Sequence, residues 1–354
     1  MTAFGSANVW VLLGAHKGDN SQVLALAEGL GLPFRAIDLR YRWFAHVPAV
    51  CRSISISQLE DECRFEIAPP WPSLVLGIGQ RSVPVARFIQ HESGGRTKIV
   101  RLGDPMISPR YFNLVITTTQ YAVREADNVL RLPITISNHD KVRPDGFEEP
   151  WLHSFAHPRR LLVIGGKTSL WRFDSEVITE AAARLLKRAV NEGGSVLAVT
   201  SPRTSPPLIE AAREALGERA VVSGAFPRYG ALLHGADEIH VTGDSVSMLS
   251  DAVAAGKPVG LIPLKPDGLA TLLRVGGEIR GRPFRMRRLD QFWNDLRARG
   301  LVGTLDEPRS GRLHSCPMDT AVVAVRALLG DAVPEQVEAT QRPSPKPVRK
   351  PAAL

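Results

Sequence analysis

Residues 236–263, ADEIHVTGDSVSMLSDAVAAGKPVGLIP, decide the fold of this chain. Residues 238–242 predict a short strand, residues 246–255 predict a helix, and residues 259–263 predict a second strand. Gly256 suits the position just past the end of a helix, where glycine is favoured. A strand, a helix and a second strand in this order predict parallel strands joined by a right-handed crossover.

The loop before this helix is rich in small polar residues. Asp244, Ser245 and Ser247, with Met248 in the same turn, lie where backbone N–H groups are free. Because a helix N-terminus favours negative charge, a diphosphate fits there. Asp251 lies one turn further along the Ser247 face, where a carboxylate can accept hydrogen bonds from a pair of sugar or ribose hydroxyls. The alternative is that Asp244 or Ser245 only caps the helix and Asp251 is solvated.

The same alternation of strand, Gly- or Ser-rich loop and helix runs through the rest of the chain. It predicts an α/β fold of two Rossmann-like parallel-sheet domains that face a central cleft. The predicted units are residues 1–150, residues 151–332 and a disordered Pro- and Lys-rich tail at residues 333–354. Further strands are predicted at residues 9–13, 74–76, 98–102, 114–118, 160–164, 195–199 and 221–222, and helices at residues 21–30, 85–90, 174–190, 208–216 and 229–234.

The loop after the first predicted strand has the pattern Gly14-x-x-x-Gly18-Asp19-Asn20. Glycine at positions 14 and 18 would let the backbone approach a ligand closely. Asp19 or Asn20 would cap the helix that follows. A tight turn with a cap also explains these residues without a ligand, so both interpretations stay open.

Three polar residues at the predicted cleft are candidates for a general base that acts on an acceptor hydroxyl. They are His16, Asp19 and Asp104, and the residues alone do not choose among them. Arg81 follows another predicted strand, in GIGQRS at residues 77–82. It is either a cleft residue or a surface side chain at the start of a helix.

A hydroxyl-rich loop follows the predicted strand at residues 195–199. Hydroxyl groups together with one arginine suit a diphosphate. The surrounding prolines fit a plain turn equally well. The candidate residues in this loop are Thr200, Ser201, Arg203 and Thr204.

The composition is that of a soluble globular protein, with 44% hydrophobic and 23% charged residues in a chain of 354. No apolar run reaches the roughly 18 residues that a membrane-spanning helix needs. The N-terminal residues lack the basic and apolar regions of a signal peptide. The three cysteines have no metal-ligand spacing. We therefore expect a cytoplasmic protein.

The chain is basic, with a formal net charge of +8. Part of this charge lies at residues 280–288. One interpretation is that this segment forms a patch that binds anionic lipid headgroups or a phosphorylated acceptor. Such a patch would make the protein peripheral at the inner membrane. The alternative is a solvated surface. Nucleic acid is not expected, because no nucleic-acid-binding motif is present. The arginines concerned are Arg280, Arg282, Arg285, Arg287 and Arg288.

Residues 236–263 also resemble the donor-binding segment of GT-B glycosyltransferases of the cell-wall and lipid A type. The chain to about Leu329 is more similar to bacterial proteins of the mitochondrial-fission "elongated mitochondria" (ELM) family. Asp251 stands where that family usually has Glu. The matching positions are Ala236-Asp237, Ser250-Asp251, Ala254-Ala255-Gly256, Pro258 and Ile262-Pro263 for the first resemblance, and residues 18–20, 200–204 and 244–248 for the second.

The resemblance implies a GT-B fold and an enzyme that transfers a sugar from a nucleotide-diphosphate donor, with uridine as the base by analogy, to an unknown acceptor. It implies that Gly165 and Gly166 approach the donor phosphates and that Tyr229 lies at the nucleotide base. No cofactor and no metal are expected, because a helix dipole and basic side chains can stabilise a leaving diphosphate. Two alternatives stay open: a non-enzymatic adaptor at a membrane surface, and a GT-B-type epimerase, which would need carboxylates and a histidine in the cleft.

Overall fold

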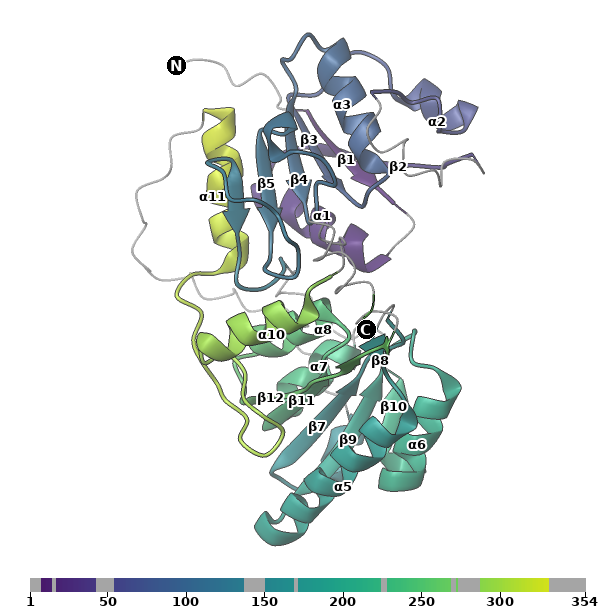
Figure 1. Cartoon of the computed structure of the whole chain (residues 1–354), viewed down its shortest axis with the longest axis vertical. Helices are drawn as coiled ribbons and strands as arrows, with labels where there is room; N and C mark the ends of the chain where they lie inside the picture. The colour runs from purple at the N-terminus through teal and green to yellow at the C-terminus, as the bar shows by residue number, and fades with distance from the viewer. Residues whose placement is uncertain are drawn as a thin grey trace, which may run out of the picture.

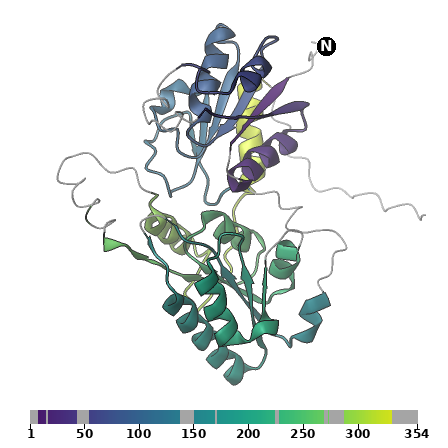
Figure 2. The ribbon, with the colours of Figure 1, turned by 90° about the vertical axis from the view of Figure 1, so that its right-hand side faces the viewer.

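The computed structural model describes residues 8–14, 17–42, 54–136, 150–168, 171–223, 228–268, 272 and 287–330. Two α/β halves lie one above the other along the long axis of the molecule (Figure 1). They remain distinct when the view is turned by 90° (Figure 2). Each half is built on one parallel sheet, so the expected α/β class is confirmed.

The first sheet has six parallel strands in the order β2-β1-β3-β4-β5-β6. Val11 and Leu76 pack on α1 from one face, whereas Trp10 and Val75 pack on α3 from the other. Successive side chains of a strand point to opposite faces, which explains this division. The bounds are β1 Val9–Leu13, α1 Lys17–Leu30, β2 Phe34–Asp38, α2 Asp61–Glu66, β3 Leu74–Ile78, α3 Ser82–Glu92, β4 Lys98–Leu102, the 3-10 helix Pro109–Tyr111, β5 Leu114–Thr117 and β6 Val129–Arg131.

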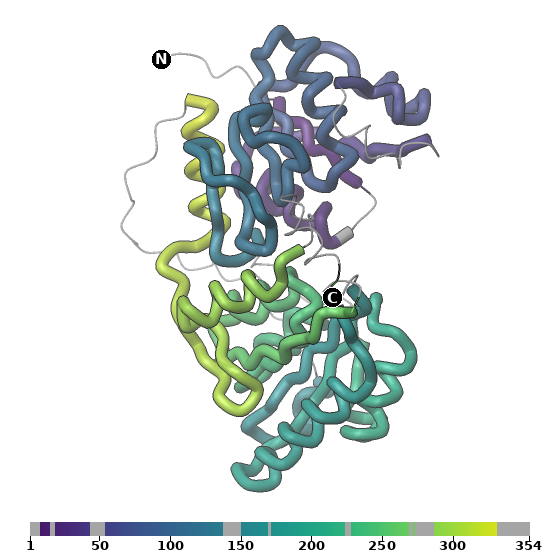
Figure 3. The backbone as a smooth tube through the Cα atoms, viewed as in Figure 1, coloured from purple at the N-terminus to yellow at the C-terminus, as the bar shows by residue number. Residues whose placement is uncertain are grey.

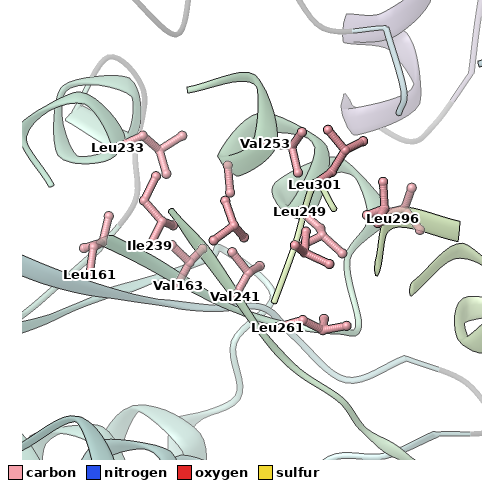
Figure 4. Close-up of a cluster of buried hydrophobic side chains, with 14 of the residues drawn as sticks. Leu161, Val163, Leu233, Ile239, Val241, Leu249, Val253, Leu261, Leu296 and Leu301 are labelled. Carbon is pink, nitrogen blue, oxygen red and sulfur yellow. The ribbon is translucent and has the colours of Figure 1, made fainter. Parts of the chain in front are cut away.

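The second sheet has five parallel strands in the order β10-β9-β7-β11-β12. Helices α5 and α6 cover one face, and α7, α8 and α10 cover the other. Figure 4 shows the core that α7, α8 and α10 cover, where Val241 of the sheet, Leu249 of α8 and Leu296 of α10 belong to one buried cluster. The bounds are β7 Arg159–Ile164, α5 Ser175–Glu192, β9 Ser195–Thr200, α6 Pro206–Leu216, β10 Val221–Ser223, α7 Arg228–Gly235, β11 Glu238–Thr242, α8 Val246–Ala254, β12 Val259–Ile262 and α10 Leu289–Ala298, with the 3-10 helices Pro150–Ser154 and Glu218–Ala220 and the short antiparallel pair β8 Trp171–Arg172 and β13 Lys265–Pro266.

The last described helix, α11 (Pro317–Leu329), returns to the first half (Figure 3). Its Ala321 and Val325 are buried in the core that α1 shares with the first sheet. Arg326 fixes the contact, since its Nη2 donates to the carbonyl oxygen of Leu30 over 2.9 Å. The predicted division between residues 150 and 151 stays a prediction, and α11, in the second predicted unit, packs against the first. The predicted tail at residues 333–354 lies outside the described residues.

Most predicted elements have the expected type, but the sequence analysis did not predict β2, α10 or α11. Among the predicted helices, α1 differs most in where it begins. This helix begins at Lys17 and not at residue 21, so Gly18, Asp19 and Asn20 form its first turns. The physical reason is that the side-chain amide of Asn20 forms two hydrogen bonds with the backbone of Gly14, just after β1. Its Oδ1 accepts from the Gly14 N–H over 2.9 Å, and its Nδ2 donates to the Gly14 carbonyl over 2.8 Å.

Hydrogen bonds from main-chain N–H groups join the two halves. The Thr135 N–H donates to Oγ of Ser250 on α8 over 3.1 Å. The Arg288 N–H, at the start of α10, donates to the Gln120 carbonyl over 2.8 Å. Across the described part of the chain, no helix combines the length and the apolar character needed to cross a membrane.

Candidate functional site

A cavity of about 950 Å³ lies between the two sheets. The loops that follow β1, β3, β4 and β5 line it from the first half, and the loops that follow β9 and β11 line it from the second. In open parallel sheets, ligands bind at the carboxyl ends of the strands. The cavity therefore lies where the fold places a ligand.

Asp244 and Ser245 form the wall of the cavity at the N-terminus of α8. Ser245 caps the helix, because its Oγ accepts from the Met248 N–H over 3.4 Å. Asp244 does not cap it. Its side chain is buried, with Oδ1 accepting from the Thr242 hydroxyl over 2.6 Å and Oδ2 accepting from the Gly166 N–H over 2.9 Å. Desolvation raises the pKa of Asp244 from 3.8 to about 6, although these hydrogen bonds favour the charged form.

The two glycines after β7 stand behind the cavity wall and do not line it. A Cβ atom on Gly165 would overlap the carboxylate of Asp244, and one on Gly166 would overlap the backbone of Arg203. Glycine is therefore needed here for the close packing of three loops. Contact of Gly165 and Gly166 with donor phosphates stays a prediction.

The loop after β9 contributes one charged side chain to the cavity, Arg203. The hydroxyls around it hold the loop itself. Thr204 Oγ1 donates to the carbonyl oxygen of Gly165 over 2.6 Å, and it accepts from the Ser201 N–H over 2.8 Å. Thr200 Oγ1 donates to the Val222 carbonyl over 3.4 Å. Of this predicted set, only Arg203 faces the ligand space.

From the first half, Gly14, Gly18, Asp19, Asn20 and Arg81 line the cavity. The Asn20 amide is engaged with Gly14, as described above. Asp19 stands in the first turn of α1, and its carboxylate makes no hydrogen bond or ion pair within the described residues. Asp19 therefore brings a carboxylate to the cavity, and its predicted catalytic role stays a prediction.

Asp104 lines the cavity in a turn that its own side chain stabilises. Its Oδ1 accepts from the Met106 N–H over 2.8 Å, and Met106 has a φ of 60°, which non-glycine residues rarely adopt. Arg101, which is 3% exposed, donates to the Asp104 carbonyl over 2.8 Å and to the Gly79 carbonyl over 2.9 Å. Sequence reasoning missed Arg101, although an arginine inside the apolar strand KIVRL was a signal.

Tyr121 is a second residue that the sequence analysis missed. Burial raises the pKa of its phenol, and four charged groups also act on it: Arg287, Asp19, Arg101 and Asp104. The guanidinium of Arg287 lies 5.9 Å from the centroid of its ring. No local pattern marks this tyrosine, because only the folded loops bring these groups around it.

Of the remaining predicted residues, one lines the cavity and the others lie away from it or outside the described chain. Ser247 lines it, but Met248, Tyr229 and Asp251 do not. The Tyr229 hydroxyl is buried without a hydrogen-bond partner among the described residues, and its pKa is raised well above 10.0 by desolvation and by the nearby Asp251. Their predicted contacts with base and sugar stay predictions. The residues outside the described chain are His16, Arg280, Arg282 and Arg285.

The arginine segment that was predicted to contact membranes is described only at its end. Arg287 lines the cavity, and the backbone of Arg288 joins the two halves. Membrane contact through this segment stays a prediction. No group of three His, Cys, Asp or Glu side chains that could hold a metal ion occurs in the described ranges.

Comparison with known proteins places the chain in a family. The model of the mitochondrial fission ELM1 family matches residues 17–328. The chain belongs to this ELM1 family. No curated protein matches it.

Solved structures similar to this ELM1-family protein share its fold at low sequence identity. The S. aureus MnaA–UDP complex is 12% identical, with a TM-score of 0.54, over 94% of this chain and 100% of the other. A protein assigned as a UDP-N-acetylglucosamine 2-epimerase from Listeria monocytogenes is 11% identical, with a TM-score of 0.55, over 95% of this chain and 100% of the other. The fold is therefore GT-B-like over nearly the whole chain.

Proposed function

We propose that this protein binds a nucleoside-diphosphate sugar, with UDP as the nucleotide, and transfers the sugar to an acceptor without a metal ion. The observation that carries the proposal is the N-terminus of α8, which faces the cavity beside Arg203 and opposite the carboxylate of Asp19. The UDP bound in the similar MnaA structure supports the choice of nucleotide.

The second half supplies the groups for the diphosphate. The first N–H groups of a helix have no acceptor inside the helix, so those of Val246 and Ser247 are available to phosphate oxygens. Arg203 adds a positive charge in the loop after β9. Together they stabilise the negative charge that develops as the diphosphate leaves.

The first half supplies the groups for the acceptor. The carboxylate of Asp19 takes the proton of an acceptor hydroxyl, whose oxygen forms a bond to the anomeric carbon. The bond from that carbon to the diphosphate oxygen breaks at the same time, and the diphosphate leaves with the electron pair. Asp104 is the alternative base, although its Oδ1 is engaged with Met106.

A UDP-sugar 2-epimerase is the second candidate, favoured by the fold of the Listeria protein. The two activities give different products from one substrate. NMR of UDP-N-acetylglucosamine incubated with the protein would show release of UDP for transfer to water, and inversion at C2 with the nucleotide still attached for epimerisation.

Isothermal titration calorimetry with UDP, GDP, CMP and ADP tests the donor site. We expect UDP to bind, and we expect Arg203→Gln to weaken its affinity about tenfold, as for the loss of one charge-assisted hydrogen bond. Arg213→Gln is the matched control, because Arg213 lies on α6, does not line the cavity and pairs with Glu218. Absence of binding for all four nucleotides would refute the proposal.

A further inference from the structure

Two arginines on the cavity wall have aromatic neighbours and, among the described residues, no carboxylate partner. The guanidinium of Arg81 lies 5.0 Å from the ring centroid of Tyr41, and that of Arg287 lies 5.9 Å from the ring centroid of Tyr121. All four residues line the cavity. Within the described residues, neither Arg81 nor Arg287 forms an ion pair.

A ring contact leaves the hydrogen-bonding capacity of an arginine unused. The guanidinium is planar, and it meets an aromatic ring through its face, whereas its five N–H donors lie along its edge. The ring restricts the side chain, so less rotamer entropy is lost when an anion binds. Such an edge matches the two oxygens of a carboxylate or a phosphate.

A third guanidinium, that of Arg101, lies in the same wall in a fixed orientation. It donates to the carbonyl oxygens of Gly79 and Asp104 and, over 3.0 Å, to the hydroxyl of Ser82. Arg81 and Arg101 come from the first half, whereas the diphosphate groups of the proposed function come from the second. The first half therefore adds arginines to the cavity, beside Asp19 and Asp104, away from the groups that a donor would use.

We propose that the acceptor carries an oxyanion, a phosphate or a carboxylate, which Arg81 and Arg287 bind while the acceptor hydroxyl faces Asp19. This inference rests on the proposed function, since it names the class of acceptor for the same cavity. The anion also anchors the acceptor, which holds its hydroxyl near the anomeric carbon.

The test uses the full chain saturated with UDP, so that the diphosphate site is filled. Inorganic phosphate and, separately, acetate are titrated at constant ionic strength, and the melting temperature is followed. A ligand that binds only the native state raises it by mass action. We expect phosphate or acetate to raise the melting temperature further. We expect Arg81→Gln and Arg287→Gln each to weaken the affinity for that anion about tenfold and to leave the affinity for UDP unchanged.

Arg87→Gln is the matched control, because Arg87 lies on α3 with its guanidinium 4.6 Å from the Tyr111 ring, outside the cavity. A rise with phosphate alone identifies a phosphate acceptor, and a rise with acetate alone a carboxylate. No rise with either anion, or one that survives both cavity substitutions, overturns the inference. If UDP does not bind, the proposed function fails on its own. Phosphate is then titrated into Arg203→Gln with and without the additional substitution Arg81→Gln. Weaker phosphate binding in the double variant would still identify the anion site.

Discussion

The backbone N–H of Gly166 donates to Oδ2 of Asp244 over 2.9 Å, joining the loop after β7 to the loop after β11. The same region is supported from the side of α10, where Trp293 Nε1 donates to the Gly243 carbonyl over 3.1 Å. The position of the α8 N-terminus in the cavity therefore depends on two loops and a helix that are distant in sequence.

Replacing Gly165 by alanine should disturb this junction, because the new methyl group would overlap the Asp244 carboxylate. We expect Gly165→Ala to lower the free energy of unfolding by about 1–3 kcal/mol, as overpacking does, and to weaken UDP binding. Urea denaturation and calorimetry measure the two effects. Gly268→Ala is the control, since open space surrounds that position. Equal stability of the two variants would contradict the close packing.

The buried carboxyl of Asp244 should make stability depend on pH. Its pKa rises from 3.8 to about 6 on folding, so the folded state keeps a proton that the unfolded state loses between these values. The contribution of the group is therefore full below about pH 4 and is lost as the pH rises through 6. Asp244→Asn removes this loss of stability at higher pH, and its amide oxygen can still accept the hydrogen bond from the Gly166 N–H. Relative to wild type, we expect the variant to gain about 3 kcal/mol between pH 4 and pH 7.5.

Urea denaturation of both proteins at the two pH values gives this difference directly. Because each comparison is made at one pH, the titration of other groups cancels. An unchanged difference between variant and wild type across the range would show that Asp244 does not hold its proton on folding.

Asparagine variants separate the two carboxylates among the candidate bases. Asp19→Asn removes a carboxylate that has no partner in the described structure, whereas Asp104→Asn keeps an oxygen for the Met106 N–H. We expect Asp19→Asn to slow hydrolysis of the UDP-sugar at least about 100-fold with UDP affinity retained, and Asp104→Asn to change it little. The rate of UDP release is the readout. The reverse order of effects would assign the role to Asp104.

A second ionisable cluster lies at the opposite end of the second sheet and should act on stability alone. Glu238 bonds His240 over 3.2 Å and Arg188 over 3.0 Å, and these partners, His240 first, lower its pKa from 4.5 to about 2. Its contribution is thus present above about pH 4.5 and is lost as the pH falls toward 2. We expect Glu238→Gln to cost about 3 kcal/mol at pH 7, partly because Arg160 is fully buried beside it.

Unfolding at pH 7 and at pH 3 measures this effect, and the cost should shrink at the lower pH. Glu218→Gln is the comparison, since Glu218 pairs with Arg213 at the surface, where ion pairs contribute little. Equal costs for the two variants at pH 7 would contradict the argument from burial.

The elements of the fold were predictable because local patterns report them. The strand at residues 238–242 has the predicted bounds, and Gly256 stands at the predicted position just past α8, where its φ is 70°. The residues that line the cavity were predictable where they stand in the loop or the first helical turn after a strand, as Asp19, Asp104 and Arg203 do. The prediction was less complete where one loop packs on another, as Gly165, Thr204 and Asp244 do, because the sequence does not show which loops meet.

By itself, the sequence determined the alternation of strands and helices, the parallel sheets and the loops that border the cavity, since hydrophobic period and turn residues act over a few positions. The tertiary structure alone decided that α11 packs on α1, that Arg287 lines the cavity, and that Asp244 is buried against Gly166. The physical reason is that local patterns state which face of an element is buried, whereas the partner that buries it is chosen by contacts between segments far apart in the chain.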